Sequence, residues 1–197
     1  MIRRLALAAA LALAPLAAIA QELSLGEISS YLNSLQTAQG GFTQVNADGS
    51  ISTGTIYIKR PGRVRFEYDD QQALFLAGGG QVAVFDRAST EGPQRFPLRE
   101  TPLSIILADI VDLSRAGMVT GHTSDGTSTT VTAQDPEHPD YGSIQLVFTA
   151  DPVELRQWVV TDQSGGQTTV ILNDLRTGGR VPDRLFNIRA ELEAWGQ

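Results

Sequence analysis

From Phe42 onward apolar residues alternate with polar ones, and turn-forming residues interrupt the alternation at short intervals, as in "NADGS", "RPGR", "YDDQ" and "GGG". An alternation of period two is typical of half-buried strands, and connections this short join antiparallel neighbours. The pattern therefore predicts antiparallel hairpins rather than a parallel sheet. About eleven strands are expected, near residues 42–46, 51–60, 63–68, 73–77, 82–86, 118–124, 127–134, 142–149, 154–162, 167–175 and 185–188.

Two segments carry apolar residues at helical spacing instead. Ser24 and Glu27 have the spacing of a capping box, which predicts a helix over about 24–37 that ends at Gly40-Gly41. Thr101-Pro102 is a typical helix start, and it predicts a second helix running to about Leu113. The apolar stripe of this second helix is Leu103, Ile106, Leu107 and Ile110.

Two helices are too few to cover the outside of so long a sheet. A strongly curled sheet that wraps around them buries the most apolar surface, which predicts an incomplete, half-open antiparallel barrel of the α+β class. With no internal repeat, low-complexity tract or linker in the sequence, a single domain is the simplest interpretation.

The first twenty residues indicate export. Arg3 and Arg4 precede a run of sixteen mostly apolar residues that ends in Ala18-Ile19-Ala20, which predicts a signal peptide cleaved after residue 20 and a domain over 21–197. A membrane anchor is the alternative, but the run is short for a span and Pro15 interrupts it.

Charge and composition narrow the classes of function. Without Arg3 and Arg4 the chain keeps 13 of its 15 basic residues against 22 acidic ones, a net charge near −9, so a nucleic-acid partner is not expected. There is no cysteine, which excludes disulfides and a lipid-modified N-terminal cysteine.

The sequence carries no recognisable catalytic motif. Gly-x-Ser-x-Gly and His-Glu-x-x-His are both absent, and "GGG" at 78–80 opens no helix, so it is a turn rather than a phosphate loop. The segment "DPEHPD" could ligate a cation, but its prolines favour a solvated loop. We expect no enzyme activity, no metal and no cofactor.

The hairpin "IYIKRPGRVRFEY" (56–68) places one cation in an unusual position. A three-residue loop, "PGR", pairs Arg60 with Val64 and Ile58 with Phe66, and it keeps the apolar side chains on one face. Lys59, Arg63 and Arg65 are then solvated. Arg60 falls at the rim of the apolar face, where it either needs acceptors such as carbonyls at a helix C-terminus or extends past the rim into water.

These residues resemble the periplasmic outer-membrane lipoprotein carrier family, LolA. The matching segments are "GFTQ" (41–44), "GTIYIKRPGRVRFEY" (54–68), "TPLSIIL" (101–107), "DQSGGQTTVILNDL" (162–175) and "RLFNI" (184–188). The resemblance implies an incomplete barrel whose concave apolar face is closed by helices that act as a lid. It also implies that Arg60 latches this lid in the empty state and releases it when acyl chains enter.

The resemblance further implies a soluble, monomeric periplasmic carrier. Its partners would be the acyl chains of lipoproteins, an inner-membrane ABC-type releasing complex and an outer-membrane receptor. Residues expected to line the acyl-chain cavity, or alternatively to form an ordinary core, are Ile56, Ile58, Val64, Phe66, Tyr68, Leu103, Ile106, Leu107 and Ile110. A lipid-sensing or protein-binding module on the same half-barrel is an alternative function, and a hydrolase with an unrecognised site is a second.

Overall fold

The structure, a computed structural model, describes residues 22–196, so the expected signal segment 1–20 lies outside the described residues. Within residues 22–196, eleven strands form one antiparallel sheet in the order β6-β5-β4-β3-β2-β1-β11-β10-β9-β8-β7. The strands are β1 (Thr37–Val45), β2 (Ile51–Lys59), β3 (Arg63–Tyr68), β4 (Ala73–Gly78), β5 (Gln81–Asp86), β6 (Gln94–Pro97), β7 (Val119–Ser124), β8 (Ser128–Gln134), β9 (Ser143–Thr149), β10 (Glu154–Thr161) and β11 (Gln167–Thr177).

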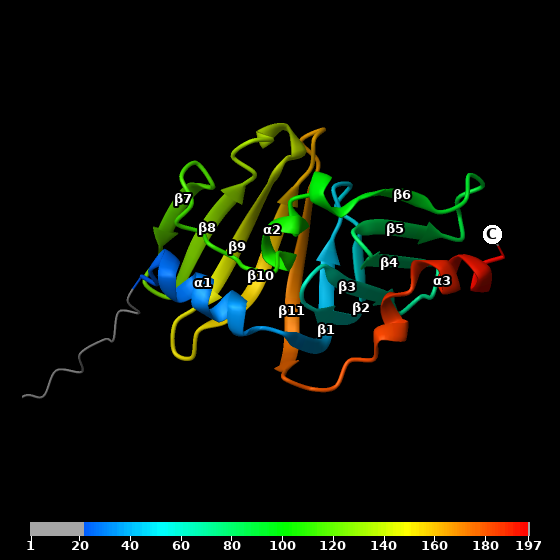
Figure 1. The fold of residues 1–197 in the computed structure, drawn as a ribbon, viewed down its shortest axis with the longest axis horizontal. Helices are drawn as coiled ribbons and strands as arrows, with labels where there is room; N and C mark the ends of the chain where they lie inside the picture. Colours follow the sequence, from blue (N-terminus) through cyan, green and yellow to red (C-terminus); the bar gives the residue numbers. More distant parts are fainter. Residues whose placement is uncertain (1–21, 197) are drawn as a thin grey trace, which may run out of the picture.

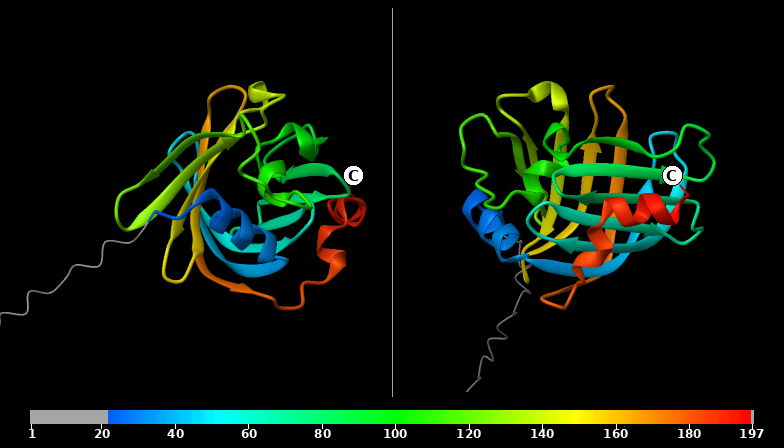
Figure 2. Two further views of the ribbon diagram at one scale, coloured as in Figure 1. Left: turned by 60° about the vertical axis from the view of Figure 1, so that its left-hand side comes forward. Right: turned by 45° about the vertical axis from the view of Figure 1, so that its right-hand side comes forward.

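The sheet curls around two of the three α-helices (Figures 1 and 2). The chain runs as a meander from β1 to the edge strand β6, crosses to the other edge and returns from β7 to β11 beside β1. The crossing segment carries the 3-10 turn η1 (Leu98–Glu100) and helix α2 (Leu103–Leu107), and it lies with α1 (Leu25–Ser34) on the concave side. The prediction of a half-open antiparallel barrel is confirmed.

The main core lies between the concave face of the sheet and these two helices. Helix α1 contributes Ile28 and Leu32, which are fully buried. Opposite them the sheet contributes Phe42, Phe148 and Trp158, which are also fully buried. The concave side of the molecule is therefore filled by side chains of α1 and α2 rather than being empty.

A second, smaller core lies on the outer face of β4 and β5. The strands contribute Leu74, Leu76, Ala83 and Phe85, and the chain after β11 covers them with Val181 and Phe186. This C-terminal strap, residues 178–196, contains the 3-10 turn η3 (Asp183–Phe186) and helix α3 (Ile188–Ala194), which lies across the outside of the sheet (Figure 2). No helix within residues 22–196 is long and apolar enough to cross a membrane.

The strap corrects one prediction, since residues 185–188 were expected to form a strand. They lie instead in η3 and at the start of α3, where the Asn187 side chain accepts a hydrogen bond from the Ala190 amide at 3.1 Å. The signal for a helix was present in the sequence, because Leu185, Ile188, Leu192 and Trp195 recur at helical spacing, and all four pack on the outer core. The eleventh strand is β6, which the sequence analysis missed.

Both predicted helices are shorter than expected. The capping box of Ser24 and Glu27 is confirmed, but α1 ends at Ser34, and Gly40-Gly41 lies inside β1 instead of ending the helix. Helix α2 ends at Leu107 rather than near Leu113, because Ala108 already has an extended backbone (ψ 153°). The carbonyls that a longer α2 would use are bound by the β2–β3 hairpin, as described below.

Candidate functional site

The tip of the β2–β3 hairpin touches the ends of both concave-side helices. The loop has three residues as predicted, but they are Arg60, Pro61 and Gly62, one position earlier than expected, so Ile58 pairs with Val64. A shift of two in the pairing leaves every side chain on its predicted face. The Arg60 amide donates to the Gln36 carbonyl just after α1, and the Gly62 amide donates to the Leu107 carbonyl at the end of α2, both at 2.8 Å.

The Arg60 side chain lies between the C-terminal ends of α1 and α2. Its guanidinium donates to the carbonyl oxygen of Leu32 in α1 and, at 2.5 Å, to that of Ala108 just after α2. Weaker contacts reach the Asp109 carbonyl at 3.5 Å and the Asn33 side-chain oxygen at 3.4 Å. Helix C-termini carry partial negative charge and unpaired carbonyls, so a guanidinium is well suited to bridge them.

Arg60 is only 4% exposed, and no carboxylate lies within salt-bridge distance of it in the described part of the chain. Burial lowers the pKa of its guanidinium, and the nearby charge of Asp109 acts in the opposite direction. An arginine stays charged in proteins, so this buried charge is held mainly by main-chain oxygens rather than by an ion pair. Its Nε has no hydrogen-bond partner among residues 22–196, which leaves this arrangement incompletely satisfied.

Asn33, which was not singled out from the sequence, joins α1 to the segment that follows α2. Its side-chain amide donates to the Val111 carbonyl, and its side-chain oxygen accepts from the Val111 amide, both at 2.9 Å. The Leu113 amide donates to the Ser29 hydroxyl at 3.1 Å. These bonds attach segment 108–113 to α1, so we refer to α1, α2 and residues 108–113 together as the lid.

Beneath the lid, the predicted apolar face is largely assembled. Ile56, Ile58, Val64 and Phe66 of the hairpin are buried in one cluster, and Tyr68 packs at its border. The buried members from α2 are Leu103, Ile106 and Leu107.

Ile110 does not share this environment. It was placed on the apolar stripe of a helix running to Leu113, but α2 ends three residues earlier and the Ile110 side chain is 76% exposed. The prediction of its position is wrong because the hairpin tip binds the carbonyls of Leu107 and Ala108 and ends the helix there.

Aromatic side chains from other strands, Phe42, Phe75 and Trp158, extend the interior beyond the predicted Phe66 and Tyr68. Phe66 makes edge-to-face contacts with Phe42, Phe75 and Trp158, with ring centroids 5.1, 5.5 and 6.2 Å apart. Tyr68 contacts Phe42 and donates to the Gln44 side chain at 3.0 Å, and burial raises the pKa of its hydroxyl. These rings come from β1, β3, β4 and β10, so only the curled sheet brings them together.

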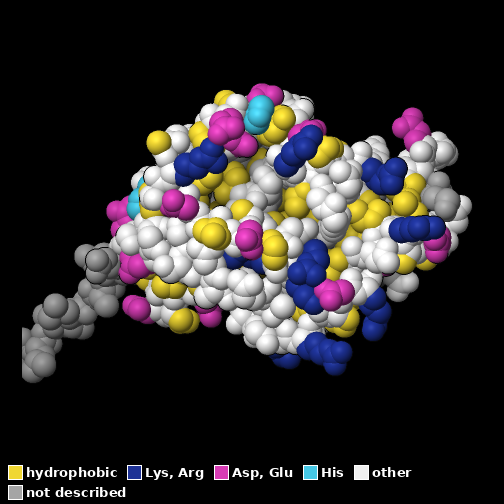
Figure 3. All heavy atoms as spheres, in the orientation of Figure 1, with side chains coloured by type: hydrophobic (Ala, Val, Ile, Leu, Met, Phe, Trp, Pro, Cys, Tyr) yellow, Lys and Arg dark blue, Asp and Glu magenta, His cyan; other side chains and the backbone are white. Residues whose placement is uncertain are grey.

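A cleft of about 550 Å³ opens beside α2, between the lid and the sheet. Phe75, Phe96, Leu103 and Val160 form its apolar walls, and the turn after β10 forms its rim. Hydrophobic side chains are visible in the hollow on this face of the molecule (Figure 3). The cleft is continuous with the core beneath the lid, because Phe75, Phe96 and Val160 pack against that core.

The other three cations of the hairpin are held by the strap rather than solvated as predicted. Arg65 is 8% exposed and donates to the Leu185 carbonyl at 3.0 Å and to Glu191 at 2.7 Å. Lys59 and Arg63 both lie 2.7 Å from the Asp183 carboxylate and are only partly exposed. The prediction of solvation is wrong because it left no element to cover the outer face.

The site thus combines an apolar face, the lid packed on it and one buried arginine that hydrogen-bonds to both ends of the lid. The side chains brought together by this region form no nucleophile–base pair, and no cluster within residues 22–196 could hold a metal ion.

Comparison with known proteins gives a consistent family. Residues 33–189 match the family model described as outer membrane lipoprotein carrier protein LolA. The outer-membrane lipoprotein carrier protein of Pseudomonas putida (strain W619) is 24% identical over 182 residues, covering 88% of this chain and 85% of that protein. The protein of the same description from Coxiella burnetii (strain CbuK_Q154) is 22% identical over 180 residues, covering 86% and 84%.

Among solved structures, this chain is similar to a putative outer membrane lipoprotein-sorting protein domain from Vibrio parahaemolyticus. The TM-score is 0.48 at 10% identity, and the match covers 86% of this chain and 97% of that one. An uncharacterized conserved protein from Thermus thermophilus matches with a TM-score of 0.46 at 9% identity over 83% and 91% of the two chains.

Proposed function

The chain belongs to the family of the outer membrane lipoprotein carrier protein LolA, and from that membership we propose that residues 21–197 act as a periplasmic carrier of lipoproteins. The relatives are described as carriers rather than enzymes, and their cargo is lipoprotein. In this proposal the protein accepts lipoproteins from an inner-membrane ABC-type releasing complex, shields their acyl chains and delivers them to an outer-membrane receptor.

The observation that supports the proposal is the hydrogen bonding of Arg60 to both ends of the lid, above a continuous apolar face. A lipoprotein anchor exposes acyl chains whose transfer into water costs about 0.8 kcal/mol per methylene, so crossing an aqueous compartment requires a cover. The lid and the curled sheet supply such a cover, and the cleft beside α2 offers a place where an acyl chain can first enter.

Loading requires the lid to move, because its own side chains fill the concave face. The side chains proposed to contact acyl chains are Ile56, Ile58, Val64, Phe66, Tyr68, Leu103, Ile106 and Leu107. When the lid opens, Arg60 loses the carbonyls of Leu32 and Ala108. The free energy of closing is subtracted from the affinity for cargo, which keeps binding weak enough for release.

Arg60 contributes about 1–3 kcal/mol to this closing energy, the usual range for hydrogen bonds from a charged donor. Such a contribution lowers the affinity for cargo by about one to two orders of magnitude. A carrier benefits from this weakening, since it must give up its cargo to a receptor.

A dye-displacement experiment tests the function directly. A hydrophobic dye is bound to the purified protein, and a diacylated peptide is added, with the same peptide lacking acyl chains as the control. We expect displacement by the acylated peptide alone, and native mass spectrometry is expected to detect the lipid-bound species. Equal displacement by both peptides, or no displacement by either, would refute the carrier function.

A further inference from the structure

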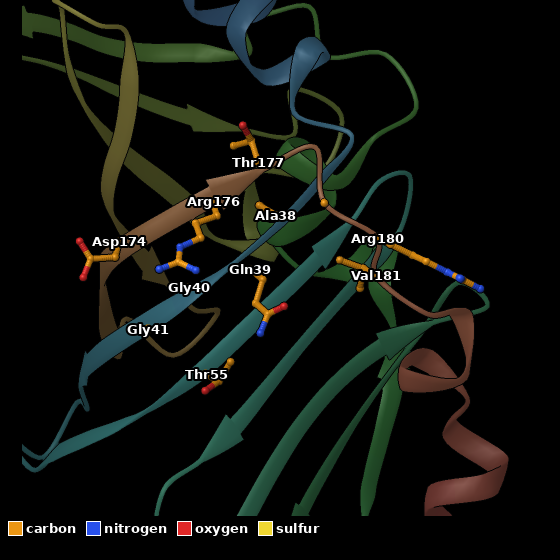
Figure 4. Close-up of a pocket in the computed structure, with 11 residues that line it drawn as sticks. Ala38, Gln39, Gly40, Gly41, Thr55, Asp174, Arg176, Thr177, Arg180 and Val181 are labelled. Carbon is orange, nitrogen blue, oxygen red and sulfur yellow. The ribbon is translucent and has the colours of Figure 1, made fainter.

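The outer face of the sheet carries a second hollow, opposite the lid. This pocket of about 440 Å³ lies where β1, β2 and β11 meet the start of the strap. Its polar lining includes Gln39 of β1, Thr55 of β2 and Arg176 of β11 (Figure 4). None of these three side chains makes a hydrogen bond or ion pair with another part of residues 22–196, so their donors face the pocket unpartnered.

A β-bulge places Arg176 in this pocket. Val170 and Leu172 face the inner core, and strict alternation would send Arg176 inward with them. Instead the pairing of β1 with β11 shifts between Gln39 and Gly41, with Asp174 in the left-handed region (φ 49°). The bulge turns Arg176 outward opposite Gln39, as bulges commonly re-aim a side chain.

Two adjacent glycines, Gly40 and Gly41, form the floor of the pocket, and they differ in the space available for a side chain. A Cβ on Gly40 would lie 2.8 Å from the Asn173 carbonyl oxygen, so the bulge excludes any side chain there. A Cβ on Gly41 would lie no closer than 3.5 Å to its neighbours, which is ordinary contact. Nothing in the backbone requires glycine at 41, yet its bareness keeps the pocket open beside Arg176.

The surroundings of the pocket are basic in an otherwise acidic protein. Arg176 and Arg180 line it, Lys59 donates to the carbonyl of the lining residue Val181, and Arg63 lies beside Lys59 on the shared carboxylate of Asp183. The nearby carboxylates are Asp183, which Lys59 and Arg63 share, and Asp174, whose side chain points away from Arg176 (Figure 4). Four cations against two carboxylates give a local charge near +2, whereas the whole chain has a formal charge of −7.

We propose that this pocket is a docking site for an acidic segment of a partner protein, with Arg176 receiving a carboxylate. A guanidinium binds a carboxylate through two parallel hydrogen bonds, and the Gln39 amide and the Thr55 hydroxyl add donors for a second oxygen or a neighbouring carbonyl. The pocket is recessed, so a projecting side chain reaches it better than a flat bilayer surface does.

The position of the site connects it to the latch hairpin. Val181 lines the pocket, and its carbonyl accepts a hydrogen bond from Lys59 at 2.9 Å, one residue before Arg60. A partner bound here would contact the strap on the outer side of the hairpin. It would not cover the lid, which lies on the inner side. The proposal does not depend on the cargo, because the outer pocket is tested with an acidic peptide and the inner face with an acylated one.

Binding of a model peptide to the full mature chain tests the site. The probe is a fluorescein-labelled octapeptide of alternating glutamate and glycine, followed by fluorescence anisotropy, and the control probe carries glutamine in place of glutamate. We expect the glutamate peptide to bind and the glutamine peptide not to bind. Arg176→Gln should weaken binding at least fivefold, and Arg176→Glu at least tenfold.

Two further variants separate the pocket from net charge. Gly41→Val fills the floor without changing charge and should also weaken binding at least fivefold. Arg95→Glu makes the same charge change as Arg176→Glu at the far edge strand β6, and it should have less than a twofold effect. Unchanged melting temperatures establish that all variants are folded.

Three results would overturn the proposal. The first is an affinity that neither Gly41→Val nor Arg176→Glu changes. The second is an equal loss in Arg95→Glu and Arg176→Glu, which would mean attraction by net charge alone. The third is that the protein binds phosphatidylglycerol vesicles but not the peptide, and that Arg176→Glu abolishes the vesicle binding. The site would then recognise a lipid headgroup.

Discussion

The guanidinium of Arg60 donates a hydrogen bond to the carbonyl oxygen of Ala108 at 2.5 Å, across 48 residues of sequence. This contact ends α2 after five residues and binds the hairpin tip to the lid at the same point. The Gly62 amide, bound to the Leu107 carbonyl, reinforces it from the other side of the loop. The end of α2 and the attachment of the hairpin to the lid therefore depend on the same few atoms.

Arg60→Leu is expected to leave the fold intact and loading possible but to impair release. Leucine fits the apolar rim, while the closed lid loses about 1–3 kcal/mol of charge-assisted hydrogen bonding, so cargo affinity rises about five- to 150-fold. Transfer of a lipoprotein from the loaded protein to receptor-bearing membranes measures the effect. Arg99→Leu, at a side chain 83% exposed, serves as control. Transfer at the wild-type rate in Arg60→Leu would exclude the latch.

Asn33→Ala should loosen the lid without removing the latch. The amide and the carbonyl of Val111 each lose a partner in a partly buried site, at a cost of about 1–3 kcal/mol. Hydrogen exchange at residues 108–113 is expected to accelerate about tenfold, while exchange in β9 and β10 stays unchanged. Ser34→Ala, at an exposed position in the same helix, should leave the exchange of residues 108–113 as it is. Equal exchange in both variants would contradict the role of Asn33.

Arg65→Met should detach the strap. Arg65 joins β3 to the strap through the Leu185 carbonyl and Glu191, and its loss leaves the Glu191 carboxylate, with a side chain 20% exposed, without its cation. We expect the free energy of unfolding in urea to fall by about 3 kcal/mol and proteolysis near residue 180 to accelerate. The exposed pair of Arg189 and Glu193 provides the control, because Arg189→Met should change stability by less than about 0.5 kcal/mol.

Gly54→Ala and Gly41→Ala form a matched pair in adjacent strands. A Cβ at residue 54 would lie 2.0 Å from the Glu67 carbonyl oxygen and 2.7 Å from the Phe42 ring, so the strands must separate. The expected destabilisation of Gly54→Ala is about 3 kcal/mol or more, whereas Gly41→Ala should be nearly neutral. Thermal unfolding followed by circular dichroism distinguishes them, and similar melting temperatures would refute this description of the β1–β2–β3 contact.

The ion pairs of Asp183 should depend on pH with a definite sign. Lys59 lowers the pKa of the Asp183 carboxyl from 3.8, first through its hydrogen bond and then through its charge, and Arg63 adds to the effect. Because the folded-state pKa is depressed, this contribution to stability is complete above the unfolded value. It is lost as pH falls through the folded value, below about pH 4.

A carboxyl titration by NMR checks this sign. The Asp183 midpoint should lie below 3.8 in the wild-type protein and move back toward 3.8 in Lys59→Met. A midpoint that is the same in both proteins would show that Lys59 does not hold the carboxylate.

Much of the strand pattern could be predicted because alternation and turn residues are local properties. The hairpin of β2 and β3 illustrates how far this reaches. Parity assigned Ile56, Ile58, Val64 and Phe66 to the buried face correctly, even though the loop was misplaced by one position. A displaced turn that shifts the pairing by two residues preserves the faces, so the inference from parity was insensitive to that error.

The chain after β11 shows where such inference failed. Leu185 and Ile188 carried a helical signal, but the segment is short and its partner surface, Leu76 and Phe85 on the outside of the sheet, is distant in sequence. Without knowledge of that surface, Arg65 had no reason to be buried. Likewise, Ile110 continued an apolar stripe until the hairpin tip, far from it in sequence, ended the helix.

The sequence by itself determined the period of ten of the eleven strands, the capped start of α1, the face on which each hairpin side chain lies and the family to which the chain is similar. Only the tertiary structure decided what covers the outer face, where α2 ends and which way Arg176 points. The physical reason is that alternation and capping depend on neighbours within a few residues, whereas helix ends, bulges and buried cations depend on hydrogen-bond partners that the curled sheet brings from distant parts of the chain.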